Sequence, residues 1–125
     1  ARVRHLLRQG NEVQQMMTVV GEEGTSIDDF TVALKADFFD NCYLQQNAFD
    51  EVDAATPAER QQIVFAKVTE VIDLDFGFSD KVEARTKMVE VTDLFRNWNY
   101  AAPGSDEYMQ WLAKIDQFIA TKGRS

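Results

Sequence analysis

The chain has 125 residues, of which 45% are apolar, and this length suits one compact domain around a single hydrophobic core. Its 21 acidic and 13 basic side chains give a net charge of -8, which disfavours a nucleic-acid or anionic-membrane surface. The single cysteine, Cys42, excludes an intrachain disulfide and a metal site built on clustered thiolates, and it fits a reducing, cytosolic setting.

Apolar residues recur every three or four positions along almost the whole chain, and this period predicts an all-α fold. The predicted buried stripe of the first helix consists of Leu6, Val13, Met17 and Val20. Gly10 interrupts this stripe and would let a neighbouring helix approach closely. Gly21 ends the helix, and the pair Met16 and Met17 is interpreted as core filling.

Two further helices follow, each with its own start signal. Ser26, with Asp29 three residues later, resembles a capping box and predicts a helix from near residue 27. Its buried face is predicted to contain Phe30, Leu34 and Phe38. The stretch 56-TPAE-59 is the clearest start, with Thr56 as N-cap and Pro57 in the first turn. The face of this third helix comprises Val64, Val68, Val71 and Ile72.

The helical pattern breaks at 76-FGFSD-80 and resumes twice. Asp80 with Glu83 predicts a cap for a fourth helix, whose buried face is Ala84, Met88, Val91, Phe95 and Trp98. Pro103-Gly104-Ser105 precedes a fifth helix, which carries Tyr108, Leu112, Ile115 and Ile119 and ends at Gly123. We therefore expect residues 1–125 to form one bundle of about five helices with short connections.

Most signatures of catalysis are absent from the sequence. Neither a GxxxxGK[ST] phosphate loop nor a GxGxxG turn occurs, and His5 is the only histidine, so a histidine triad or a two-histidine metal site is excluded. The acidic pairs at 28–29, 50–53 and 73–75 could suggest acid–base groups or a calcium loop, but solvated helix ends explain them better. We expect no catalytic residue and no metal site within this chain.

A neutral polar run with flanking aromatics stands out in this acidic chain. The run 43-YLQQNAFDEVD-53 resembles the C-terminal helical domain of the catalytic A subunit of vacuolar-type and archaeal-type rotary ATPases, in which an aromatic-LQQN-x-aromatic segment is a strong mark. The stretch 12-EVQQMMTVVGEEGTSIDDFTVALKADFF-39 resembles the helix, acidic turn and helix that precede this mark. The resemblance covers residues 3 to about 72, while the last two helices match only in being helical and C-terminal.

The resemblance implies an adenine contact at Tyr43 and Phe49, with Gln46 between them also at the pocket. Rings six residues apart lie about 120° apart around one continuous helix, so a helix that ends between them would let both converge. The alternative is that both rings only pack the junction of the second and third helices. ATP or ADP with Mg²⁺ would bind the full-length subunit, whose phosphate loop lies upstream; this segment alone is expected to need no cofactor and to be inactive.

The acidic turn Gly21-Glu22-Glu23-Gly24 is the implied contact with the rotating central stalk, and the alternative is an ordinary solvated turn between helices. Further implied partners are B subunits in an alternating A/B hexamer, at the cytoplasmic surface of the membrane. The implied function couples ATP synthesis or hydrolysis to proton or sodium transport. No run approaches the roughly 20 apolar residues of a membrane span, so we expect no direct membrane insertion.

Because the chain begins at Ala1 without Met, it is expected to be a segment of a longer polypeptide. The rival function is a free-standing helical adaptor that binds a partner helix in a groove. A glycine-rich phosphate loop encoded upstream would separate the two interpretations in favour of the ATPase.

Overall fold

The computed structural model describes residues 2–44, 58–102 and 104–123. Its elements in chain order are α1 (Arg2–Val20), α2 (Ile27–Phe39), the π-helix η1 (Asp40–Leu44), α4 (Ala58–Ile72), α5 (Lys81–Tyr100) and α6 (Asp106–Thr121). The described ranges contain helices and turns and no β-strand, so the predicted all-α bundle of about five helices is confirmed.

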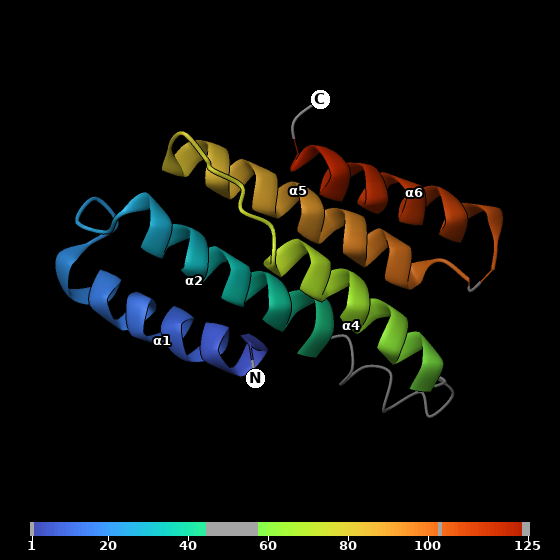
Figure 1. Ribbon diagram of the computed structural model, residues 1–125, viewed down its shortest axis with the longest axis horizontal. Helices are drawn as coiled ribbons and strands as arrows, with labels where there is room; N and C mark the ends of the chain where they lie inside the picture. Colours follow the sequence, from blue (N-terminus) through green and yellow to red (C-terminus); the bar gives the residue numbers. More distant parts are fainter. Residues whose placement is uncertain (1, 45–57, 103, 124–125) are drawn as a thin grey trace.

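Successive helices run in opposite directions through the bundle (Figure 1). Helix α2 is central: α1 packs on one side of it and α5 on another, while α6 pairs with the far side of α5. Helix α4 contacts η1 and α2. The turn before α2 and the π-helix after it therefore lie at opposite ends of the same central helix.

Side-chain caps begin three of the helices at the positions where the sequence places a start. A side-chain oxygen accepts a backbone amide in each case: Ser26 from Asp29 at 3.1 Å, Asp80 from Glu83 at 2.8 Å, and Ser105 from Tyr108 at 3.1 Å. These bonds satisfy amides that the first turn of a helix leaves without a partner. The proposed cap Thr56 and the adjacent Pro57 lie outside the described residues, and α4 begins at Ala58.

The predicted buried faces of α4 and α5 are confirmed in full, since every residue named for them is buried. The stripe of α1 is wrong at Val20, which is 52% exposed where the helix gives way to the turn. Core filling holds for Met17, which packs against the core, but Met16 is 38% exposed. On α6 the sequence pattern missed Phe118, which is buried together with Ile115.

The break in pattern at 76–80 is an irregular segment whose two phenylalanines join the core. Phe76 and Phe78 are both buried, and their rings stack with centroids 4.7 Å apart. Lys35 of α2 holds this segment, because its Nζ donates a 2.7 Å hydrogen bond to the carbonyl of Leu74. Burial lowers the pKa of Lys35, and the nearby carboxylate of Asp75 partly opposes that shift.

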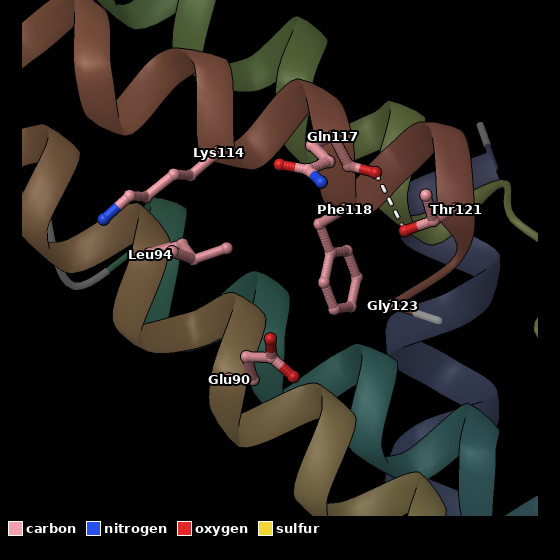
Figure 2. A pocket seen from close by; sticks show the side chains of 7 residues that line it. All are labelled: Glu90, Leu94, Lys114, Gln117, Phe118, Thr121 and Gly123. Atoms are coloured by element: carbon pink, nitrogen blue, oxygen red, sulfur yellow. Dashed lines mark hydrogen bonds between the residues drawn. The ribbon is translucent and has the colours of Figure 1, made fainter. Parts of the chain in front are cut away.

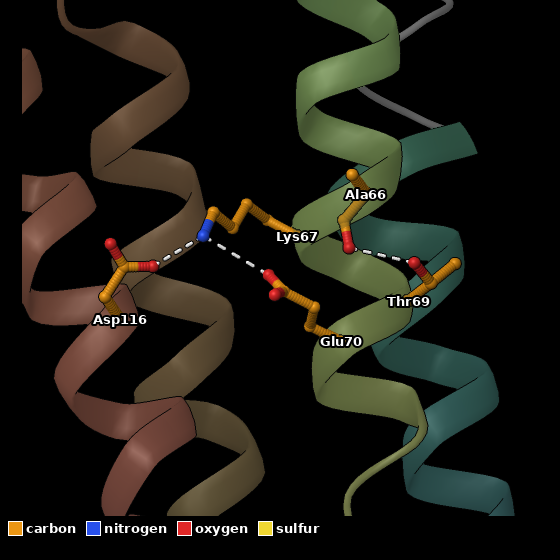
Figure 3. A network of polar contacts seen from close by, with 5 residues as sticks. All are labelled: Ala66, Lys67, Thr69, Glu70 and Asp116. Carbon is orange, nitrogen blue, oxygen red and sulfur yellow. Dashed lines mark hydrogen bonds and ion pairs between the residues drawn. The ribbon is translucent and has the colours of Figure 1, made fainter.

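An ion pair joins α4 to α6 across the bundle. Lys67 Nζ lies 2.7 Å from Asp116 of α6 and 3.3 Å from Glu70 of its own helix (Figure 3). The hydrogen bond to Asp116 raises the pKa of Lys67. Both carboxylate side chains are about half exposed, so this pair orients α4 more than it stabilises the bundle.

The close approach of α1 and α2 at Gly10 yields a stability prediction. A Cβ atom added at Gly10 would lie 2.4 Å from Cβ of Ala36, closer than two carbons can pack. Although Ala favours helices by about 1 kcal/mol over Gly, we expect Gly10→Ala to lower the free energy of unfolding by about 1–3 kcal/mol through overpacking.

Urea denaturation of the isolated chain measures this effect, with the exposed Gln15→Ala of α1 as the control. Adding Ala36→Gly restores the space, so the double variant should be less destabilised than the sum of the two single changes. Stability of Gly10→Ala at or above that of the unsubstituted chain would show that α1 and α2 do not meet there as described.

Candidate functional site

Tyr43 lies in the π-helix η1, which continues α2 without a break. Its ring centroid is 5.3 Å from that of Phe39 and 5.1 Å from that of Phe65 on α4. The rings of Phe39 and Phe65 are themselves 6.3 Å apart at 80°. We call these three side chains the aromatic cluster; Phe39 is buried, Tyr43 is half-buried and Phe65 is 37% exposed.

The other two residues of the proposed adenine contact, Gln46 and Phe49, lie outside the described residues. Whether the rings of Tyr43 and Phe49 converge therefore stays a prediction. Tyr43 also contacts the helix on the far side of this segment, because α4 supplies Phe65. Tyr43 thus packs at the junction of α2 and α4 and remains partly exposed, so these contacts do not decide between the adenine contact and the packing alternative.

The orientation of Tyr43 follows from the residue before it. Cys42 is 1% exposed, and its Sγ lies 4.0 Å from the carbonyl oxygen of Thr92 on α5. Burial raises the pKa of the Cys42 thiol to about 12. Because Cys42 faces α5, the neighbouring Tyr43 faces α4, and η1 is held between the two helices.

The acidic turn is exposed at Glu22, Glu23 and Gly24, and hydrogen bonds fix its backbone. Gly21 adopts φ +81°, a conformation that suits glycine, and its amide donates to Met17 at 2.9 Å, which confirms the predicted helix end. Thr25 is buried and donates from its hydroxyl to the Gly21 carbonyl at 3.1 Å. Hydrogen bonds within the turn therefore fix the conformation of its backbone.

Helix α5 holds this turn through contacts that the sequence pattern does not indicate. The carboxylate of Glu22 pairs with Arg85, and Lys81 Nζ donates to the carbonyl oxygen of Glu22. The guanidinium of Arg85 also lies over the Phe30 ring, 5.2 Å from its centroid. Glu23 is exposed, so the two acids of the turn differ: one is tied to α5 and the other faces outward.

The chemical character of this end of α2 comes from three aromatic rings and the phenol hydroxyl of Tyr43. The described part of the chain contains no group of three or more His, Cys, Asp or Glu side chains that could hold a metal ion. Within the aromatic cluster, Tyr43 and Phe65 are partly exposed and Phe39 is buried. Aromatic side chains of this kind stack with flat, uncharged rings.

A separate hollow of about 220 Å³ lies between α5 and α6 (Figure 2). Its lining includes Glu90 and Leu94 of α5 together with Lys114 and Phe118 of α6. None of the described residues that line it belongs to η1 or α4, so it is distinct from the aromatic cluster.

None of the helices searched, within the ranges described above, is long and apolar enough to cross a membrane.

The fold and site define a class: a small helical domain with a part-exposed aromatic cluster at one end of its central helix and an acidic turn at the other. The family model that matches residues 1–74 is the C-terminal domain of V and A type ATP synthase. The chain belongs to this family.

Relatives extend the similarity over nearly the whole chain. The V-type ATP synthase alpha chain of Treponema denticola is 46% identical over 98% of this chain and 21% of its own length. That of Borrelia duttonii is 49% identical over 95% of this chain, again 21% of its own length. The chain thus spans about a fifth of these relatives. No solved structure matches it significantly.

The buried thiol beside Tyr43 allows a chemical test of how η1 is packed. A thiolate is the reactive species, and a pKa of about 12 against an ordinary 9.0 lowers the thiolate fraction of Cys42 at pH 8 by ~1000-fold. A thiolate of higher pKa is also the stronger nucleophile, so we expect a disulfide reagent to modify Cys42 at least ~30-fold more slowly in the native chain than in concentrated guanidinium chloride. Similar rates in the two conditions would contradict the placement of Cys42 against α5.

Proposed function

We propose that this chain is the C-terminal domain of the catalytic A subunit of a V-type ATP synthase or ATPase, which couples ATP synthesis or hydrolysis to proton or sodium transport. The observation that carries the proposal is the 46% identity to a V-type ATP synthase alpha chain over 98% of this chain. In this role the domain is peripheral to the membrane on the cytoplasmic side. Its partners are B subunits, alternating with A subunits in a hexamer, and the central stalk.

The domain would contribute one wall of the adenine pocket. Tyr43, with Phe49 and Gln46 in the segment that follows, would contact the base, while an upstream domain supplies the phosphate loop, the Mg²⁺ site and the group that orients the attacking water. The partial exposure of Tyr43 supports this assignment. An aromatic face binds adenine without acting on the phosphates, so the domain positions the nucleotide and the isolated chain should be inactive.

The acidic turn would transmit motion to the central stalk. Gly21, Glu22, Glu23 and Gly24 stand at the start of α2, and the aromatic cluster stands at its end. Packed helices move as bodies, so a shift of the adenine site would displace the turn. The contacts of Glu22 with Arg85 and Lys81 make α5 part of the same moving body.

Substitution of Tyr43 tests the adenine contact in the assembled complex. We expect Tyr43→Ala to raise KM for ATP by about 5- to 150-fold, the equivalent of about 1–3 kcal/mol for a lost base contact. The rate at saturation should change little, because the contact is similar in ground and transition states. Steady-state hydrolysis assays measure both constants.

Two variants control this experiment. Tyr43→Phe keeps the ring and should behave like the natural enzyme, and Tyr100→Ala removes an exposed tyrosine at the end of α5. A collapse of the saturating rate with KM unchanged would mean that Tyr43 does not contact the base.

Removal of residues 21–26, with both flanking helices intact, tests the lever. We expect lower torque in single-molecule rotation of the assembled complex, because the shortened tip no longer reaches the stalk. Glu23→Ala should be tolerated, and so should Glu22→Ala, since a half-exposed ion pair is worth at most about 1 kcal/mol. Unchanged torque after the deletion, in complexes that assemble normally, would refute the stalk assignment.

A further inference from the structure

Phe65 is a large apolar side chain whose position core packing does not account for. It lies on α4 next to the buried Val64, yet 37% of it is exposed. Ile63, two residues earlier on α4, is also exposed, but it lies about 160° away from Phe65 around the helix and takes no part in the aromatic cluster. Phe65 instead contacts the rings of Tyr43 and Phe39, which belong to η1 and α2. Phe65 therefore packs mainly on the other two rings of the aromatic cluster.

Two rings, those of Phe39 and Phe65, restrict the ring of Tyr43. Phe39 is 3% exposed and is fixed in the core, and it meets the Tyr43 ring at 5.3 Å with the planes 35° apart. Phe65 meets the same ring at 5.1 Å with the planes 58° apart. Both centroid distances lie within the range of favourable aromatic pairs. A rotation of the Tyr43 side chain would break at least one of these contacts.

We propose that Phe65 is a positioning residue, which holds the ring of Tyr43 in the orientation that receives adenine. This inference rests on the proposed function, because it assumes that Tyr43 contacts the base. A ring that is ordered before the nucleotide arrives loses less side-chain entropy on binding than a free one. Phe65 thereby makes base affinity depend on the placement of α4 against η1.

The test uses the complete A subunit in its assembled complex and the change Phe65→Leu, which keeps an apolar side chain but removes the ring. We expect KM for ATP to rise about two- to tenfold with an unchanged saturating rate, since one aromatic pair is lost. Phe65→Tyr should restore the natural KM, because it supplies a ring and its hydroxyl can reach solvent. Ile63→Ala is the matched control on the same helix and should leave KM unchanged.

A second comparison separates positioning from a general structural effect. In a Tyr43→Ala background, Phe65→Leu should raise KM no further, because the ring that it positions is gone. An equal rise in both backgrounds, an unchanged KM, or a fall in the saturating rate alone would overturn the role of Phe65. Where Phe65→Leu impairs assembly, Phe65→Met provides the same comparison.

The two proposals fail in different ways. If Tyr43→Ala raises KM while Phe65→Leu does not, the adenine contact stands and the positioning role is wrong. If Tyr43→Ala itself leaves KM unchanged, the adenine assignment fails, and the role of Phe65 fails with it.

Discussion

The edge-to-face contact between Phe38 and Phe95 is the interaction on which the rest of the domain depends. The two rings are 5.1 Å apart at 85°, and both are almost completely buried, so they lock α2 against α5. On another side of α2, the missing side chain of Gly10 lets α1 come into contact at Ala36. Helix α2 is thereby held from two sides and can move only together with its neighbours.

Because α2 is held in this way, the segments at its two ends are mechanically connected. Its 13 residues span about 20 Å, with the acidic turn before Ile27 and η1 directly after Phe39. Helix α5 touches both ends, through Arg85 at the turn and Thr92 at Cys42. Because α2 and α5 are both continuous helices, a displacement at one end is expected to reach the other, as the proposed lever requires.

The helices could be predicted from sequence because each carries its own repeat and those after the first also carry a start signal, as α5 does with Asp80 and the stripe from Ala84 to Trp98. The irregular segment with Phe76 and Phe78 shows no helical or strand repeat in the sequence, so its place in the core becomes known only from the structure. The pairing of Glu22 with Arg85, 63 residues away, depends on how α5 packs. At the candidate site, Tyr43 was proposed from a local motif, whereas its contact with Phe65 depends on the meeting of two helices and escaped sequence reasoning.

The central claim is that the ring of Tyr43 lies against adenine in the assembled enzyme. Photolabelling of the complex with an azidoadenine analogue of ATP, followed by mass spectrometry of the labelled peptides, tests it most directly, because the reactive group sits on the base itself. The account predicts a covalent label on the peptide that contains Tyr43, and excess ATP should prevent it. Labelling confined to peptides outside this domain, at an occupancy that ATP still competes away, would contradict the account.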